Sequence, residues 1–242
     1  MNRKCIECAV FLQVTTEQNG ETSVRFGTGF FVLCNAGRRD CVLVVTNRHV
    51  LEGFTRLELR FVTPEPVLDP SDPFSAISIG QSEVSYYGHI DDSVDLAAIA
   101  IDGIIDRITT NVPMFHRDRV LRTSDILSEK DINALEPLEK VFTVSCTNHL
   151  QEFGIASPFL RAGILSTYPA YNAGLLLLDI PCFSGYSGSP VFLEATGQLI
   201  GIVKSGVGIK YSGTEISAHQ ALAVKSSHLS GLFLPFSGLR GN

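Results

Sequence analysis

Short apolar runs separated by Gly, Pro, Asn and Asp recur along the whole chain. Many of them are rich in Val, Ile, Leu and Phe, and several are continuous rather than alternating. Runs of this length and composition, bounded by turn residues, predict the strands of small β-barrels. The predicted strands cover residues 9–14, 29–33, 41–45, 56–61, 84–87, 96–101, 140–146, 160–166, 174–180, 190–192, 199–203 and 220–224.

Two segments have helical character instead. Residues 123–138 begin with Thr123, Ser124 and Asp125 and are rich in Glu and Lys, which predicts a linker helix midway along the chain. Residues 226–233 predict a short C-terminal helix with a serine cap. We therefore expect an N-terminal unit over residues 1–118, and a linker with a C-terminal unit over 119–242.

Composition narrows the function classes. The chain has 242 residues, of which 45% are hydrophobic, and a net charge of −6. The basic runs are as short as Arg38-Arg39, so we expect no nucleic-acid partner. No apolar run approaches the length of a membrane span, and Glu7 interrupts the start of the chain where a signal peptide would need an apolar core. We therefore expect no membrane partner and a cytoplasmic location.

The six cysteines do not by themselves indicate a disulfide framework or a metal site. Cys5 and Cys8 form a lone C-x-x-C pair, and free thiols fit this better than metal or redox use. Cys34 and Cys41 flank a predicted hairpin turn and could face each other, but free thiols suit the expected compartment. The sequence therefore predicts no metal.

The sharpest chemical feature is the turn Gly185-Tyr186-Ser187-Gly188-Ser189 between two predicted strands. A serine beside glycines can expose its hydroxyl, and the glycines let backbone N–H groups point at a developing oxyanion. Alone, this sequence also fits an ordinary Gly/Ser turn. It is not an α/β-hydrolase elbow, because position 189 is Ser and no aspartate follows Asp179.

The order His, Asp, Ser is available instead. His49 follows the predicted strand 41–45, which would deliver it to a barrel rim, and a neutral imidazole can take a proton from a hydroxyl at neutral pH. A lone histidine is usually structural, but the other five lack this position at a strand end. Asp95 begins an apolar strand, and a partly buried carboxylate there needs a partner such as an imidazole N–H. A strand-capping role is the alternative for Asp95.

Taken together, these motifs resemble the trypsin-like (chymotrypsin-fold) peptidases, in particular their bacterial, HtrA-like branch. The resemblance extends to a glycine-marked strand at residues 27–32 and to two strands that wall a cleft, 200–203 and 221–224. Each motif is weak alone, but four occur in family order, with 46 residues from His49 to Asp95 and 92 from Asp95 to Ser187.

The resemblance implies an all-β fold of two six-stranded antiparallel barrels with the cleft between them. Ser187 would be the nucleophile, His49 the general base and Asp95 the residue that orients it. The N–H groups of Gly185 and Ser187 would form the oxyanion hole, and no cofactor is implied. The substrate would contact the cleft residues Pro181, Cys182, Val203, Lys204, Ser205 and Gly206.

This chain departs from the family pattern in three places. Tyr186 stands where cleavage-activated members have an aspartate, so activation by a new N-terminus is not expected. Residues 181–183 carry no carboxylate, so preference for Lys or Arg is not expected either. Lys204 replaces the small polar residue common after the cleft strand.

The predicted function is a serine endopeptidase acting on a protein or peptide. An open protease cleft inside a cell would be hazardous, so we also hypothesise latency until a regulatory protein partner binds. A catalytically silent binding module on the same fold and an esterase-type hydrolase are the alternatives.

Overall fold

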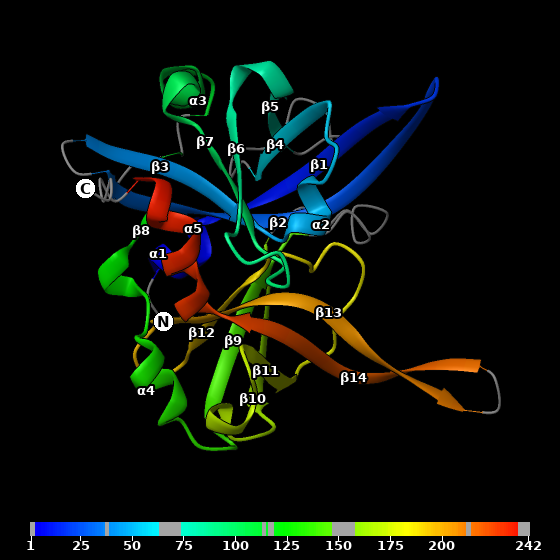
Figure 1. Cartoon of the computed structure of the whole chain (residues 1–242), viewed down its shortest axis with the longest axis vertical. Coiled ribbons are helices and arrows are strands. Elements are labelled where there is room, and N and C mark those ends of the chain that lie inside the picture. Colours follow the sequence, from blue (N-terminus) through cyan, green and yellow to red (C-terminus); the bar gives the residue numbers. More distant parts are fainter. Residues whose placement is uncertain are drawn as a thin grey trace.

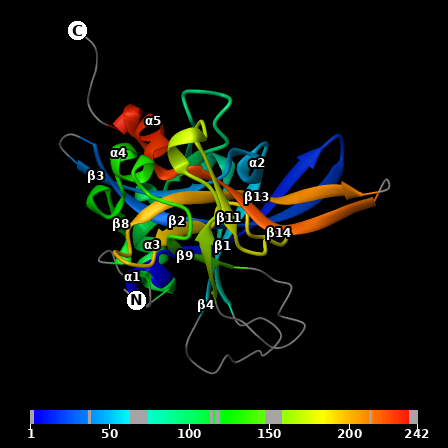
Figure 2. The ribbon, with the colours of Figure 1, turned by 90° about the horizontal axis from the view of Figure 1, so that it is seen from below.

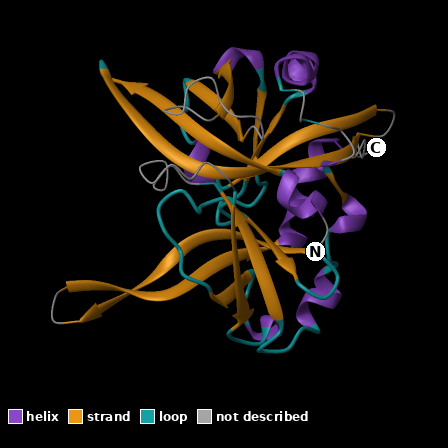
Figure 3. Ribbon diagram, turned by 180° about the vertical axis from the view of Figure 1, so that it is seen from behind, coloured by secondary structure: helices purple, strands orange, loops and turns teal. Residues whose placement is uncertain are grey.

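A computed structural model describes residues 3–36, 39–62, 74–112, 115, 119–146, 158–211 and 214–236. Strands dominate this structure, and they form two β units that lie one above the other (Figures 1 and 3). The all-β double-barrel architecture expected from the sequence is confirmed, with one difference in the N-terminal unit.

The N-terminal unit is a curled sheet with the strand order β5-β4-β1-β2-β3-β7-β6, all antiparallel, to which β8 adds a short parallel pairing with β2. It therefore has eight strands rather than six. The outermost strands, β5 and β6, are connected by residues 81–84 alone, so the sheet must curl back on itself. The strands are β1 (Ala9–Gln18), β2 (Glu21–Ala36), β3 (Arg39–Thr46), β4 (Arg56–Val62), β5 (Phe74–Gly80), β6 (Ser85–Gly88), β7 (Ala97–Ala100) and β8 (Leu121–Arg122).

The C-terminal unit is a closed six-stranded antiparallel barrel in the order β10-β11-β14-β13-β12-β9. This confirms the six strands expected for the second barrel. They are β9 (Lys140–Ser145), β10 (Phe159–Leu165), β11 (Leu175–Asp179), β12 (Pro190–Leu193), β13 (Leu199–Tyr211) and β14 (Thr214–Lys225).

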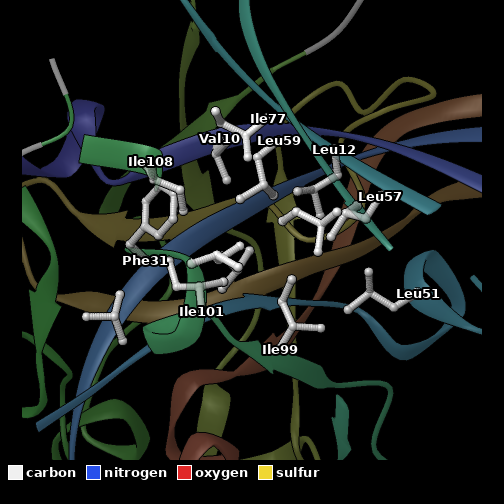
Figure 4. Close-up of a cluster of buried hydrophobic side chains, with 14 of the residues drawn as sticks. Val10, Leu12, Phe31, Leu51, Leu57, Leu59, Ile77, Ile99, Ile101 and Ile108 are labelled. Carbon is white, nitrogen blue, oxygen red and sulfur yellow. The ribbon is translucent and has the colours of Figure 1, made fainter. Parts of the chain in front are cut away.

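Three apolar clusters hold the units together. The first fills the N-terminal unit, where Val10 and Leu12 of β1 pack with Phe31 and Ile99 (Figure 4). Another lies inside the C-terminal barrel. The third joins the units, because it combines residues of the first sheet with residues of the barrel: Phe30, Val32, Leu43, Val45, Phe142, Val144 and Phe192. Strand β2 thus packs apolar side chains on both of its faces, which explains the continuous apolar run at 29–33.

The helices are short. They are α1 (Arg3–Glu7), α2 (Arg48–Leu51), α3 (Ile105–Asn111), α4 (Glu129–Asn133) and α5 (Leu229–Phe233), with 3-10 turns η1 (Gln81–Glu83), η2 (Asp102–Ile104), η4 (Thr123–Asp125), η6 (Pro169–Tyr171), η7 (Ser226–His228) and η8 (Leu234–Phe236). The predicted C-terminal helix 226–233 is present as η7 and α5. No helix of the described ranges has the length and apolar character needed to cross a membrane.

The predicted linker helix over 123–138 is wrong in extent. After η4, Ile126 bridges to Leu199 of β13, and the Leu127 N–H donates to the Leu199 carbonyl at 2.9 Å. Helix α4 begins only after Ser128, whose hydroxyl accepts from the Asp131 N–H. Apolar residues 126 and 127 pack on the barrel in extended form, and tertiary contact overrides the local helical composition. Residue 118, at the predicted unit boundary, lies outside the described residues.

Two hairpins are longer than predicted and form arms. The β1–β2 arm turns at Asn19 and Gly20, which have φ of 53° and 81°, and its register runs unbroken from Ala9 opposite Phe30 to Gln18 opposite Glu21. The β13–β14 arm has bulges near residues 204 and 207. Both arms leave the body on the same side in two perpendicular views (Figures 1 and 2).

The closure of the barrel generates a prediction about Gly163 of β10. A Cβ at this position would lie 2.2 Å from the Asp179 carbonyl oxygen and 2.4 Å from Ile180 Cγ1. We expect Gly163→Ala to lower the free energy of unfolding by about 1–3 kcal/mol, as overpacking does. Gly103→Ala is the matched control, since nothing lies within 4 Å of its Cβ position. Urea unfolding measures both variants, and equal stability of the two would contradict the packing argument.

Candidate active site

His49 and Asp95 are brought together at the edge of the N-terminal unit. Asn47 precedes α2, and its side-chain amide donates to the Asp95 carbonyl at 2.9 Å. On the first turn of α2, His49 Nδ1 lies 2.7 Å from Asp95 Oδ2, and the His49 backbone N–H donates to Oδ1 at 3.0 Å. A carboxylate only accepts hydrogen bonds, so Nδ1 carries a proton, and in the neutral ring Nε2 is then the nitrogen with the free lone pair.

The Asp95 carboxylate is held in its ionised form. Burial raises its pKa, but the hydrogen bonds from the His49 ring and backbone outweigh burial, helped by the charge of Lys204. The net result is a pKa below the usual range for aspartate. With 14% of the Asp95 side chain exposed and 48% of the His49 side chain exposed, the carboxylate is the sheltered partner and the ring faces the solvent.

The loop that leads to Asp95 is fixed from both sides. Arg48 donates to Asp92 at 2.6 Å and to the His89 carbonyl at 2.8 Å. The buried His89 ring accepts from the Asp91 N–H at 3.0 Å, and its Nε2 donates to the His228 carbonyl at 3.0 Å. His89 is thus a structural link between this loop and the C-terminal η7.

The Ser187 turn is a tight, glycine-dependent structure. Gly185 and Gly188 have φ of 91° and 88°, in the left-handed region that favours glycine. At Gly188, a Cβ would lie 2.0 Å from the Thr28 carbonyl oxygen and 2.1 Å from Thr46 Oγ1. The Gly188 N–H donates to the Val203 carbonyl at 2.8 Å, which ties the turn to β13.

Thr28 of β2 attaches this turn to the N-terminal unit. Its backbone N–H donates to the Ser187 carbonyl at 2.8 Å, and its hydroxyl donates to the Gly185 carbonyl at 2.8 Å. The same hydroxyl accepts from the Cys146 N–H at 3.0 Å. The Thr28 carbonyl in turn accepts from Thr46 Oγ1 at 2.7 Å. The fully buried Thr28 therefore lies between the two units and holds both sides of the Ser187 turn.

Gly27 of β2 lies between helix α2, which carries His49, and the Ser187 turn. A Cβ on Gly27 would lie 2.7 Å from Cγ1 of Val50, the residue after His49, and 3.3 Å from the Ser187 carbonyl oxygen. Helix α2 and the Ser187 turn thus pack against the same point of β2. The Ser187 hydroxyl donates to the Lys204 carbonyl at 3.1 Å, and within the described residues no hydrogen bond joins it to His49.

The side chain of Tyr186 is hydrogen-bonded by Arg161, a residue that the sequence analysis did not identify. Its buried ring places the hydroxyl 2.6 Å from Arg161 Nε of β10, which donates to it. The Arg161 guanidinium carbon lies 5.0 Å from the centre of the Phe183 ring, which stands edge-on to Tyr186. Burial raises the pKa of Tyr186, and Arg161 opposes this. No motif marks Arg161 in the sequence.

The residues expected to contact the substrate differ in their exposure to solvent. Val203 is buried, whereas Lys204, Ser205 and Cys182 are partly exposed. Cys182 faces Gly206, whose Cβ position is 3.6 Å from Cys182 Cβ, and burial raises the pKa of this thiol to about 11. Pro181, also partly exposed, precedes it. Their roles in substrate binding stay predictions.

A pocket of about 310 Å³ lies between the two units beside Asp95. Lys204 and His228 line it from the C-terminal unit, and Asp91 and Val94 from the other. Burial and the nearby His89 lower the pKa of His228. Among the described residues, no three His, Cys, Asp or Glu side chains gather in a way that could hold a metal ion.

The Asp95–His49 pair generates a prediction about acid stability. Since the pKa of Asp95 is lower in the folded chain, its charge stabilises the fold above the unfolded pKa of about 3.9, and this stabilisation is lost as pH falls below that value. We expect Asp95→Asn to be less stable at pH 6 by about 1 kcal/mol, as for a partly exposed pair, and the difference from the parent to shrink toward pH 3. Urea unfolding at each pH measures it. Ser187→Ala, which removes no carboxylate, is the control, and a pH-independent difference for Asp95→Asn would contradict the assignment.

Comparisons with known proteins agree with this architecture. A family model described as a trypsin-like peptidase domain matches residues 27–202. The apo MamO protease domain from Magnetospirillum magneticum is similar in structure, with a TM-score of 0.55 and 14% identity over 95% of this chain and 97% of that one. At this identity the likeness shows the fold alone. A search of curated proteins gives no significant match. The extent of the family match, on a fold that carries the family's strand arrangement, makes this chain a member of the trypsin-like peptidase domain family.

Proposed function

We propose that this chain is a serine endopeptidase that hydrolyses peptide bonds through an acyl-enzyme. The observation that carries the proposal is the 2.7 Å contact between His49 Nδ1 and Asp95 Oδ2. The next residue, Val50, and the Ser187 carbonyl both lie close to Gly27 of β2, which brings the two motifs near each other. Membership of the trypsin-like peptidase family supports this class of reaction.

In the proposed reaction, Ser187 Oγ attacks the substrate carbonyl carbon while His49 Nε2 takes its proton. His49 then gives that proton to the leaving amine. In the second half, His49 takes a proton from the water that attacks the acyl-enzyme, and it returns this proton to Ser187 Oγ as the C–O bond to the acyl group breaks and the acid is released. Asp95 stays ionised throughout, keeps the proton on Nδ1 and stabilises the imidazolium.

The backbone of the Ser187 turn supports an oxyanion-binding role. In the part of the chain that the structure describes, no hydrogen bond uses the N–H of Gly185 or of Ser187. Both carbonyl groups, by contrast, accept from Thr28. Donors that are fixed in place yet have no partner can stabilise a developing negative charge, each by about 3–4 kcal/mol.

The hydrogen bond from Ser187 to the Lys204 carbonyl implies a resting state. While the hydroxyl points at this carbonyl, it does not offer its proton to His49. A substrate N–H that binds the Lys204 carbonyl would displace the hydroxyl, and rotation about one side-chain bond would bring it toward the imidazole. Hydrogen bonds in free active sites are often of this kind and become aligned only with substrate. Latency released by a regulatory partner is part of the proposal.

The hydrogen bond from the Ser187 hydroxyl to the Lys204 carbonyl also favours one alternative, a catalytically silent binding module on the peptidase fold. In that case Ser187 would keep its bond to Lys204 under all conditions, and the pair of His49 and Asp95 would be structural. Labelling of Ser187 by a fluorophosphonate would rule out the silent module, because only an activated serine reacts with it. An unlabelled protein is expected both of the silent module and of a latent peptidase before its partner is added. An esterase would also be labelled, and comparing the turnover of matched peptide and ester substrates distinguishes it.

We expect Ser187→Ala to abolish labelling and to lower peptide turnover at least about 10³-fold, since the residual rate would come only from the oxyanion hole and substrate binding. Its melting temperature should match the parent's. Ser230→Ala is the control, because this exposed serine of α5 bonds only locally, to the Ser227 carbonyl at 2.8 Å. Full labelling of Ser187→Ala would rule out this residue as the nucleophile.

The Arg161–Tyr186 contact gives a second expected outcome. Tyr186→Phe removes the hydroxyl to which Arg161 donates a hydrogen bond, so the Ser187 turn should be held less firmly. We expect kcat to fall about tenfold with little change in KM, the result for an interaction that matters mainly in the transition state. Tyr171→Phe, at a side chain that is 85% exposed, is the control. An unchanged kcat in Tyr186→Phe would show that the hydrogen bond from Arg161 to Tyr186 does not position the Ser187 turn.

A further inference from the structure

Lys204 occupies a bulge in β13 directly beside the Ser187 turn. Val203 and Ser205 pair with successive residues of β14, so Lys204 between them has no residue opposite it. A bulge of this kind turns the side chain of the extra residue out of the regular alternation of the strand. The Lys204 carbonyl accepts from the Ser187 hydroxyl at 3.1 Å. The backbone of Lys204 thus contacts the proposed nucleophile, and its side chain takes a direction that a paired residue would not have.

That side chain lies close to the carboxylate of Asp95. Lys204 and Asp95 line the same pocket of about 310 Å³ between the two units. The Lys204 charge is one of the influences that lower the pKa of Asp95. Both Asp95 oxygens are already bonded to His49, Oδ1 to its backbone N–H and Oδ2 to its ring. Lys204 therefore acts on this pair through space, and not as a direct partner.

Two other charged side chains lie nearby, and each is bonded to a partner. Arg48, the first residue of α2, donates to Asp92 at 2.6 Å. Asp91 lines the pocket, and its Oδ1 accepts from the N–H and the hydroxyl of Ser93 at 2.9 and 2.7 Å. Lys204, by contrast, forms no ion pair with any residue of the described ranges.

The titratable groups of the neighbouring elements add no charge at neutral pH. Burial raises the pKa of Tyr86 in β6. His228 of η7 lines the pocket, and burial together with His89 lowers its pKa. The His89 ring accepts one hydrogen bond and donates another, as a neutral imidazole does. In the described structure, Lys204 is thus the unpaired cation that acts on Asp95 and His49.

A positive charge at this place opposes a second proton on the imidazole. The ionised Asp95 attracts the imidazolium form of His49, and the Lys204 ammonium offsets part of that attraction. A general base works only in its unprotonated form, so the charge preserves the base as the pH falls. The same charge makes the imidazolium formed during the reaction less stable, so the rate at high pH is not increased by it.

We propose that the Lys204 ammonium sets the pH range of the reaction, because it keeps His49 unprotonated at a lower pH than Asp95 alone would permit. The side chain acts through the pair of His49 and Asp95 and touches no reacting atom. The inference rests on the proposed endopeptidase function and adds to it a residue that controls the pH dependence.

Lys204→Met tests the charge, since methionine keeps an unbranched side chain and the β13 backbone. With fluorescently labelled β-casein as substrate, we expect the acidic limb of the kcat/KM profile to move to higher pH by at least about 0.3 unit, while the value at high pH does not fall. Lys204→Arg keeps the charge and should retain the parent's limb. Lys130→Met, at an exposed residue of α4, is the control for loss of a positive charge elsewhere.

Proton NMR follows the His49 ring directly and needs no turnover. Its Cε1–H resonance is identified by its loss in His49→Gln. We expect the pH midpoint of this resonance to rise in Lys204→Met by as much as the acidic limb does, and to stay at the parent's value in Lys204→Arg and Lys130→Met. Thermal melting verifies that each variant folds.

The two readouts separate the inference from the function on which it rests. If His49 titrates at the same pH in the parent and in Lys204→Met, the role of Lys204 is wrong, whatever the activity. A midpoint that rises equally in Lys204→Arg would also overturn it, because side-chain shape and not charge would then be responsible. If the midpoint rises only in Lys204→Met but the parent cleaves no β-casein at any pH, the charge effect stands and the failure belongs to the proposed function.

Discussion

The structure depends on one buried residue, Thr28, which holds the Ser187 turn against the first sheet. Three of its groups act at once: the N–H binds the Ser187 carbonyl, the hydroxyl binds the Gly185 carbonyl, and the carbonyl accepts from Thr46. Because Thr28 is fully buried, its N–H and its hydroxyl would lose their partners in the Ser187 turn, without water to replace them, if the two units shifted relative to each other. An unpaired buried polar group costs about 1–3 kcal/mol, so the units have a single stable alignment at this point.

That alignment restricts the neighbouring residues. A Cβ on Gly188 would lie 2.0 Å from the Thr28 carbonyl oxygen. A Cβ on Gly27 would lie 2.7 Å from Cγ1 of Val50, the residue after His49. The glycines of both motifs therefore have a packing role as well as a conformational one. Ser189 fits the same restriction, since its fully buried hydroxyl bonds Ser145 at 2.8 Å inside the barrel. Position 189 can thus hold a serine because the barrel provides a partner for it.

These contacts show which parts of the structure the sequence could predict. His49 and Asp95 stand at the ends of apolar strands, and strand ends gather at a barrel rim, so their proximity was within reach of pattern reasoning. The arms were missed because residues 15–18 and 21–28 are largely polar and break the apolar run, although Asn19-Gly20 is a strong hairpin signal. The helix predicted over residues 126 and 127 is wrong because composition does not show that the backbone of these residues pairs with Leu199 of β13. Arg161 lies in a strand 26 residues before Ser187, and only the folded barrel places it against Tyr186.

The pairing of Arg161 with Tyr186 bears on how the turn keeps its shape without a charged partner at position 186. An aspartate buried there would need a cation, and without one its desolvation would distort the turn. A tyrosine avoids this requirement, because its ring fills the space and only its hydroxyl needs a donor, which Arg161 supplies at 2.6 Å. The guanidinium also lies 5.0 Å from the Phe183 ring centre, so the cation remains on the partly exposed side of the turn and is never fully buried. Thr28 from one unit and Arg161 from the other therefore hold opposite sides of the same five residues. The Ser187 hydroxyl, by contrast, has one hydrogen bond in the described structure, to the Lys204 carbonyl.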